Sequence, residues 1–367
     1  MKKFLSLAVL YYLRFFAKFK LSKINPIIIG VTGSAGKSTC VAAIEAVLKQ
    51  KYSVKTTGTS NSESGIPLAI LGLKMNDYSL LDWIRVVILA PACFLLTANR
   101  YDILVCEMGI DSLTWPKNMD YLLSIVQPKI GVFLNALPAH TEQMGNVENI
   151  LKEKSKLIKS LPVDGTAVIN SSYNINTKAK IIKFKDDGSP IPSALAVGKI
   201  FGISKMPKFN LPVGRGNILA GINGSTLIDS SYNASPIPVI SELKKLHEKK
   251  GERKVAVLGD MRELGELAEN EHKKVAKVAT RLADIVITEG PLWKKYANFK
   301  YQFANSYQAG KFLQNFLKKG DVVLFKGSQN TIFLETAVEM CLVNKSDASK
   351  LCRRGKFWEK QRRRYRF

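Results

Sequence analysis

The chain has 367 residues, 46% of them hydrophobic, which is ample for two globular domains and too long for one simple core. Its formal net charge is +25, but no RNA-binding or helix-turn-helix signature accompanies that charge, so we expect no nucleic-acid partner. The five cysteines show neither paired spacing nor metal-type clustering, which suits a reducing cytoplasm.

Residues 1–23, "MKKFLSLAVLYYLRFFAKFKLSK", predict an apolar and basic helix. Arg14 and Lys18 interrupt the apolar run, and a spanning helix needs about 20 apolar residues. No small-residue cleavage site follows, which is against a removed signal peptide. We expect an amphipathic helix lying on an anionic membrane, peripheral at the inner face of the cell membrane. A spanning anchor and docking onto the protein's own surface are the alternatives.

A glycine-rich stretch, "GVTGSAGKST", occupies residues 30–39 between the apolar run "NPIIIG" and the helical pattern "CVAAIEAVLKQ". A strand, a glycine turn and a helix start in this order bind anions at the helix N-terminus. Lys37 can reach the outer phosphates of a nucleotide, and Ser38 can place its hydroxyl on Mg²⁺. A plain strand-to-helix turn is the alternative, but Gly-Lys-Ser-Thr after a β-branched run is far more specific. The predicted nucleotide-binding residues are Gly33, Ser34, Ala35, Gly36, Lys37, Ser38 and Thr39.

A second apolar stretch, "LLDWIRVVILAPACFLLTA", covers residues 80–98 within an apolar insertion at 77–99. Pro91 is expected to kink the helix that it forms. A buried core helix and a second membrane-facing segment are both compatible with this pattern.

Two further apolar runs, at residues 101–110 and 128–145, predict buried strands. The first ends in Glu107, and the second delivers Asn135 and His140 to its end. In an open parallel sheet, ligands bind beyond the carboxyl ends of the strands, so these side chains are expected to converge with the glycine-rich loop. Glu107 and His140 are suitable Mg²⁺ ligands, although each could alone be an ion-pair or helix-cap residue. The alternation of strands and helices predicts an α/β protein.

The motifs taken together resemble the Mur ligase family, and in particular its MurF branch, over residues 26–340. The segments that carry the resemblance, in chain order, are "GVTGSAGKST", "SNSESGIPL", "EMGIDS", "LNALPAHTEQMG", "KEKSKLIKSLPVDGTAVIN", "GRGNILAGINGSTLIDSSYNASP", "VAVLGDMRELGELAENEH" and "DVVLFKGSQNTIFLE". The resemblance implies a P-loop central ATPase domain with a mostly parallel sheet at 24–205. It also implies a Rossmann-like C-terminal domain at 213–345. Residues 346–367 are rich in lysine and arginine and form a basic tail, for which an anionic membrane surface and bulk solvent are the alternative surroundings.

The resemblance also assigns roles to single residues. It implies that Lys154 becomes carbamylated and binds a second Mg²⁺, although the sequence pattern alone predicts a solvated helix residue there. The implied metal ligands are Ser38, Glu107, His140 and Lys154, and the implied catalytic residues are Lys37, Lys154, His140, Asn135 and Arg215. In the C-terminal domain, Arg215 is expected to reach the nucleotide, and Asp229, Tyr232 and Asn233 to line its binding site.

The implied activity is ATP-dependent amide-bond formation through an acyl phosphate, adding D-alanyl-D-alanine or a related amine to a peptidoglycan precursor. A Mur-type ligase for another carboxylate and a non-catalytic, membrane-associated ATP-binding scaffold are the alternatives. The enzyme is expected to be a monomer that uses ATP and two Mg²⁺ ions. Three departures from the family stand out. A UDP-binding N-terminal domain is not expected, and the central domain is short after 165–170, where a Gly-x-His-Asn motif is missing. In addition, Asn61-Ser62 replaces the "NN" of the MurF-like turn, and Ser235 changes "YNANP" to "YNASP".

Overall fold

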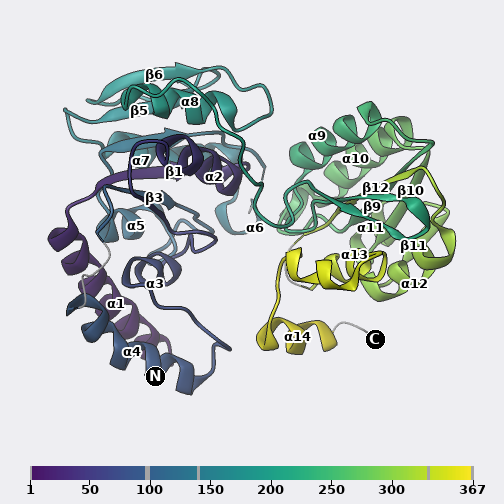
Figure 1. Cartoon of the computed structure of the whole chain (residues 1–367), viewed down its shortest axis with the longest axis horizontal. Coiled ribbons are helices and arrows are strands. Elements are labelled where there is room, and N and C mark those ends of the chain that lie inside the picture. The colour runs from purple at the N-terminus through teal and green to yellow at the C-terminus, as the bar shows by residue number, and fades with distance from the viewer. Residues whose placement is uncertain (1, 96–99, 139–140, 329–330, 365–367) are drawn as a thin grey trace. The chain divides into compact units, whose positions relative to one another are not determined.

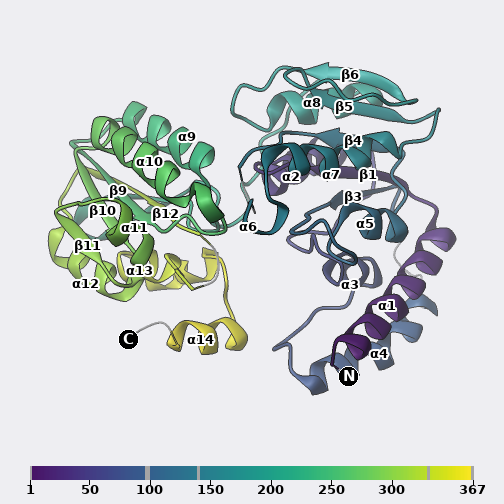
Figure 2. The ribbon, with the colours of Figure 1, turned by 180° about the vertical axis from the view of Figure 1, so that it is seen from behind.

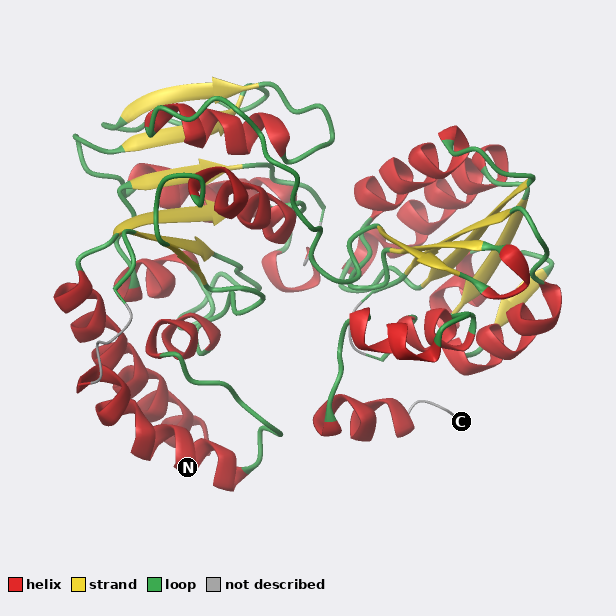
Figure 3. Ribbon diagram, viewed as in Figure 1, coloured by secondary structure: helices red, strands yellow, loops and turns green. Residues whose placement is uncertain are grey.

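The computed structural model describes the backbone of residues 2–95, 100–138, 141–328 and 331–364 (Figure 1). The chain divides into two compact units, Met1–Asn210 and Leu211–Phe367. Strands and helices alternate in both units, and each unit is built around its own six-stranded sheet (Figure 3). The predicted α/β fold class, a mostly parallel sheet followed by a second Rossmann-like domain, is confirmed.

The sheet of the first unit is entirely parallel and has the order β2-β3-β1-β4-β5-β6. Its strands are β1 (Ile27–Thr32), β2 (Val54–Thr56), β3 (Ile103–Glu107), β4 (Ile130–Phe133), β5 (Thr166–Asn170) and β6 (Lys180–Phe184). The neighbours β3, β1 and β4 are rich in β-branched residues and are mostly buried. Their carboxyl ends therefore meet at one edge of the sheet, where the strands end in Glu107, Thr32 and Phe133.

Helices cover both faces of this sheet. Side chains alternate along each strand, so that Ile103 and Val105 face one layer while Leu104 and Cys106 face the other. The first layer is α2 (Lys37–Leu48) and α8 (Ile191–Ile200). The second contains α1 (Lys2–Ile24), α3 (Gly65–Leu71), α4 (Leu80–Leu95), α5 (Met119–Ile125), α6 (Thr141–Met144) and α7 (Val147–Lys159).

Helix α1 is part of the hydrophobic core of the first unit. Leu13, Ala17 and Leu21 are buried in the same cluster as Ile66 of α3 and Val86 of α4. The docking alternative for residues 1–23 is thus observed for one face of the helix. Within the described ranges, no helix has both the length and the low polarity that crossing a bilayer needs.

The second unit has the sheet order β11-β10-β9-β12-β8-β7, in which only the edge strand β7 runs antiparallel to its neighbour. Its strands are β7 (Asn217–Ala220), β8 (Thr226–Asp229), β9 (Arg253–Gly259), β10 (Ile285–Glu289), β11 (Tyr301–Phe303) and β12 (Asp321–Lys326). One face is covered by α9 (Pro236–Glu248), α10 (Ala268–Leu282) and α11 (Pro291–Tyr296), and the other by α12 (Ser306–Phe316) and α13 (Glu335–Met340) (Figure 2). Short 3₁₀ turns occupy Ile222–Gly224, Gly265–Leu267 and Lys345–Lys350.

The C-terminal segment is folded against the second unit. It contains α14 (Lys356–Arg363), and Leu351, Cys352 and Arg362 are buried. Part of the predicted basic tail is therefore packed rather than solvated. All five cysteines are free thiols, and four of them are buried.

Candidate active site

The glycine-rich loop lies between the end of β1 and the start of α2, as its sequence predicts. Gly36 caps α2 with a φ of +80°, a left-handed conformation that favours glycine. A Cβ on Gly33 would lie 2.9 Å from the Cβ of Leu134, so a larger residue has no room there. The first turn of α2 contains Lys37 and the buried Ser38. This geometry presents backbone N–H groups at a helix N-terminus, as an anion site requires.

Asn135 ties the end of β4 to this loop. Its side-chain Oδ1 accepts a hydrogen bond from the Ala35 N–H at 2.9 Å, and its Nδ2 donates to the Ala35 oxygen at 3.2 Å. The Asn135 main-chain oxygen also accepts from the Ser34 N–H at 3.0 Å. Lys37 Nζ donates to the Gly33 oxygen within the loop at 2.9 Å. Asn135 is thus placed at the loop as predicted, and its contacts there fix the loop conformation.

Glu107 ends β3 beside the loop and is almost fully buried. Its Oε1 accepts a hydrogen bond from Asn61 Nδ2 at 3.0 Å, and its main-chain N–H donates to Thr57 Oγ1 at 3.1 Å. Its Oε2 is buried and has no hydrogen-bond partner within the described ranges. A buried carboxylate oxygen left in this way has the chemistry of a cation ligand, so Glu107 fits a Mg²⁺ site.

Lys154 lies on α7, and its side chain is buried rather than solvated, with 2% of the residue exposed. The pKa of Lys154 is lowered to about 7, first by burial and then by the positive charge of Lys37, while Asp111, Glu107 and Glu153 act in the opposite direction. The charges of Lys37 and Glu107 therefore act directly on this amine. Lys37 of the glycine-rich loop, Glu107 at the end of β3 and Lys154 of α7 therefore lie close enough for their charges to interact.

His140 lies outside the described residues, so its predicted metal role is not addressed by the structure. Among the residues that the structure describes, no group of three or more His, Cys, Asp or Glu side chains is arranged to hold a metal ion. The metal ligands that the described part can offer are therefore Glu107, the Ser38 hydroxyl and, once converted to a carbamate, Lys154.

The predicted residues of the second unit are gathered around the turn after β8. The Arg215 guanidinium lies over the Tyr232 ring, 4.1 Å from its centroid. Asp229 is fully buried, its Oδ1 accepts from the Ser231 N–H at 3.0 Å, and burial raises the pKa of this carboxyl. The Asn233 main-chain oxygen accepts from Lys326 Nζ at 2.8 Å. Burial lowers the pKa of Lys326 to about 8.

Four further residues contact or influence the predicted site residues, and the sequence motifs did not predict these interactions. Thr57 and Asn61 position Glu107, Asp111 acts on the charge of Lys154, and Lys326 supports the turn after β8. Each lies in or beside a quoted motif: Asn61 in "SNSESGIPL", Asp111 in "EMGIDS" and Lys326 in "LFKGSQN". Their contacts depend on residues far away in the chain, which the motifs alone do not identify.

Comparison with protein families decides the identity of this arrangement. The family described as Mur ligase middle domain matches residues 31–189, and the family described as Mur ligase, glutamate ligase domain, matches residues 214–329. The chain belongs to the Mur ligase family.

The most similar relatives of this Mur ligase include two enzymes named UDP-N-acetylmuramoyl-tripeptide–D-alanyl-D-alanine ligase. The one from Bacillus subtilis (strain 168) is 27% identical over 371 residues, covering 85% of this chain and 75% of that enzyme. The one from Synechocystis sp. is 26% identical over 369 residues, covering 86% and 74%. The Mur ligase described here is accordingly, by class, an ATP-dependent peptide ligase.

The fold of this Mur ligase also matches solved structures. The MurF ligase from Thermotoga maritima in complex with ADP superposes with a TM-score of 0.72 at 24% identity, over 97% of this chain and 84% of that one. The resemblance to the Mur ligase family and its MurF branch, expected from the motifs, is confirmed.

Proposed function

We propose that this Mur ligase adds D-alanyl-D-alanine, or a related amine, to the peptide carboxylate of a peptidoglycan precursor at the expense of ATP. The observation that carries the proposal is the burial of Lys154 beside Glu107 and Lys37 at the phosphate loop. A buried lysine without a function is costly, because burial penalises its charged form. The names of the similar enzymes support the choice of amine and precursor.

The phosphate loop is proposed to hold the triphosphate of ATP. Its backbone N–H groups and the Lys37 ammonium would stabilise charge on the transferred phosphoryl group, while Asn135 holds the loop in place. Mg²⁺, when bound by Glu107 and Ser38, neutralises phosphate charge. In the second unit, the proposed nucleotide-facing residues are Arg215, Asp229, Tyr232 and Asn233.

Lys154 is proposed to act as a carbamate. The lone pair of its neutral Nζ attacks the carbon of CO₂, a C–N bond forms, and one proton leaves the nitrogen. The product is an anion with two oxygens, which can serve as a ligand for a second Mg²⁺ where an ammonium cannot. The lowered pKa of Lys154, about 7, supports this step because a large share of the amine is then neutral near pH 7.

The proposed reaction has two steps. A substrate carboxylate oxygen attacks the γ-phosphorus of ATP, which forms an acyl phosphate and releases ADP. The amine nitrogen then attacks the acyl carbon, the C–O bond to phosphate breaks, and inorganic phosphate leaves as the amide forms. The chain's own contribution is mainly to position the reactants and to stabilise charge. We place the enzyme, as a monomer, at the inner face of the cell membrane.

An ADP-release assay tests this proposal. UDP-MurNAc-tripeptide and D-alanyl-D-alanine are each supplied or withheld. We expect sustained ADP release only when both are present, because acyl-phosphate formation without the amine uses at most one ATP per enzyme. Lys37→Ala serves as the inactive control. Binding of ATP without ADP release under any condition would point to the non-catalytic scaffold. ADP release that ignores the tripeptide but responds to another carboxylate would point to a different Mur-type ligase.

A further inference from the structure

Large apolar side chains are exposed along two neighbouring helices of the first unit. We define the α1–α4 surface by eight of them: Tyr11, Phe15 and Phe19 on α1, and Leu80, Leu81, Ile84, Ile88 and Leu89 on α4. The exposed fractions reach 77% for Leu81, 68% for Ile88 and 55% for Phe15. Single exposed apolar residues are ordinary, whereas a contiguous group of this size marks an interaction site.

The two helices share one seam, so their exposed side chains form a continuous surface. Tyr12 of α1 donates its hydroxyl hydrogen to the Val87 oxygen of α4 at 3.1 Å. Phe15 contacts both Phe16 and Phe19, with ring centroids 5.3 Å and 4.9 Å apart. The helices run side by side along one edge of the first unit in both ribbon views (Figures 1 and 2). Exposed rings of α1 and exposed aliphatic chains of α4 thus border the same seam.

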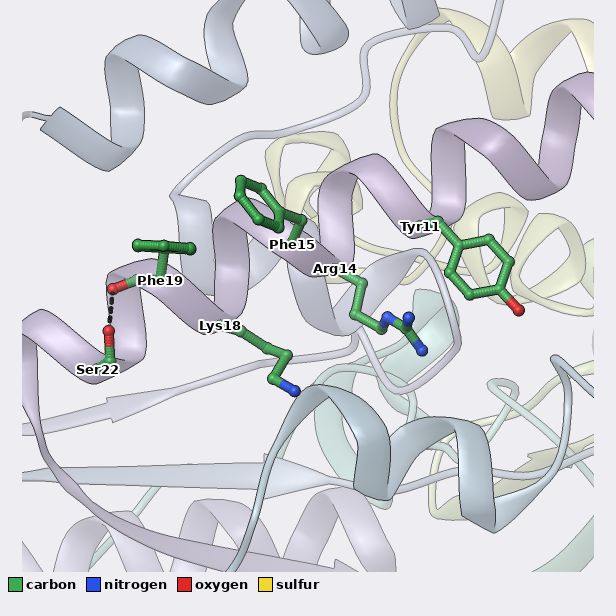
Figure 4. A pocket seen from close by; sticks show the side chains of 6 residues that line it. All are labelled: Tyr11, Arg14, Phe15, Lys18, Phe19 and Ser22. Atoms are coloured by element: carbon green, nitrogen blue, oxygen red, sulfur yellow. Dashed lines mark hydrogen bonds between the residues drawn. The ribbon is translucent and has the colours of Figure 1, made fainter.

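The charges on α1 indicate which partner fits. Residues 2–24 contain six lysines and arginines and no acidic residue. An open groove of about 500 Å³ runs along the helix and is lined by Tyr11, Arg14, Phe15, Lys18, Phe19 and Ser22. Arg14 Nη1 donates to Ser124 Oγ of α5 at 2.9 Å, so Lys18 is the exposed cation of this set. Figure 4 shows Phe15 and Phe19 on one side of the helix and Arg14 and Lys18 on the other. The acidic residue of α4, Asp82, is buried and paired with Arg85 at 2.6 Å, so it adds no exposed negative charge.

We propose that the α1–α4 surface lies on an anionic phospholipid bilayer. Its aromatic and aliphatic side chains enter the boundary between headgroups and acyl chains, and Lys18 stays at the level of the phosphates. Since Leu13, Ala17 and Leu21 fix α1 in the core, a face of the folded unit makes this contact rather than a detached helix. This membrane proposal rests on the proposed function only for the location of the enzyme in the cell. Vesicle binding can be measured without ATP or ligase activity.

The burial of one side of α1 determines which variants can test the proposal. Deleting residues 1–22 would remove Leu13, Ala17 and Leu21 from the core, so that variant would fail for reasons of stability. Point changes on the exposed side avoid this. We choose Phe15→Ser with Ile88→Ser, and as the matched control Val163→Ser with Ile181→Ser, two exposed apolar residues of the same unit away from α1 and α4.

The experiment is cosedimentation of the full chain with phosphatidylglycerol-containing vesicles and with neutral phosphatidylcholine vesicles, at low and high salt. We expect the wild type to bind anionic vesicles, with weaker binding at high salt. The Phe15/Ile88 variant should bind at least tenfold more weakly, whereas the Val163/Ile181 control should bind like the wild type. Lys18→Gln should weaken binding at low salt only.

Three results would overturn the proposal. The wild type could stay in the supernatant at low salt, or the Phe15/Ile88 variant could bind as tightly as its control. A wild-type dimer that the Phe15/Ile88 variant dissociates, together with no vesicle binding, would assign the surface to a second copy of the chain. An intact ATP-induced rise in melting temperature in each variant verifies folding. If the wild type binds vesicles but shows no ligase activity, the proposed function is wrong and the membrane proposal still stands.

Discussion

Arg353 and Glu335 form a buried ion pair in the second unit, with 3.1 Å between Nε and Oε1 and side chains that are 5% and 0% exposed. The same guanidinium donates to the main-chain oxygen of Tyr232 at 3.0 Å and to that of Ser231 at 2.8 Å. A residue of the C-terminal segment therefore holds the turn on which Tyr232 stacks against Arg215.

We expect Arg353→Met to destabilise the protein by about 3 kcal/mol, because it removes the nearer of two arginines from buried Glu335 and leaves only Arg362, whose Nη1 lies 3.8 Å from Oε1. Urea denaturation measures the change. The matched control is Arg354→Met, which removes a half-exposed pair with Glu339 and should cost about 1 kcal/mol or less. An equal decrease in the free energy of unfolding in the two variants would mean that the buried ion pair stabilises the protein no more than the partly exposed one.

Lys37→Ala should abolish stabilisation by nucleotide while leaving the fold intact. A ligand at about 100 times its Kd stabilises the folded state by about 2.7 kcal/mol, which a thermal melt detects readily. Lys49→Ala, which changes a lysine just after the other end of α2, should keep the full ATP-induced shift. A shift of wild-type size in the Lys37 variant would refute the assignment of the loop.

Lys154→Ala should lose activity at least about 100-fold, since a metal ligand would be missing. Short carboxylates such as formate should restore part of it by occupying the space of the carbamate. Lys152→Ala, on the same helix and exposed, is the control that should remain active. In ¹³C-bicarbonate, the NMR spectrum of the wild type should show a carbamate carbon signal that the Lys154 variant lacks. Full activity of the Lys154→Ala variant without added carboxylate would contradict the carbamate proposal.

Buried carboxyls of the second unit predict a pH-dependent stability. Asp260 accepts hydrogen bonds from the N–H groups of Leu292 at 3.0 Å and Trp293 at 2.9 Å, and burial raises its pKa from 3.8 to about 6. Burial also raises the pKa of Glu289 well above its usual value. A raised carboxyl pKa means that the folded state holds the proton more tightly than the unfolded state does.

The stabilisation from Asp260 is therefore complete below pH 4 and is lost as pH rises through about 6. Two pKa units correspond to about 3 kcal/mol at most. Asp260→Asn should flatten this part of the stability curve in urea denaturation between pH 4 and 7, whereas Glu266→Gln, at an exposed site just before α10, should leave it unchanged. A wild-type curve that rises over this range would contradict the prediction.

Local patterns were sufficient to predict the glycine-rich loop and the two strands that lead to Glu107 and Asn135. Glycine spacing and β-branched runs specify these features within a few residues of chain. The burial of Lys154 was not predicted from the helical pattern, because it depends on β3 and the loop, which lie far away in the sequence. The packing of Arg353 was missed for the same reason, since a run of basic residues indicates solvent unless a partner such as Glu335 is known.

The docking of α1 was one alternative among three because its sequence is apolar around most of the helix. Which side turns inward is decided by α3 and α4, which supply Ile66 and Val86. Phe15 and Phe19 lie on the opposite side and stay exposed, because no other element among the described residues covers them.

This arrangement has a consequence for synthesis of the chain on the ribosome. Leu13, Ala17 and Leu21 are translated well before Ile66 and Val86, the residues that cover them in the folded unit. Until α4 has left the exit tunnel, the nascent chain presents a helix that is apolar on its inner and outer sides and carries only positive charge. Such a segment is open to capture by chaperones, or by the membrane itself, before the phosphate-binding unit can close around it.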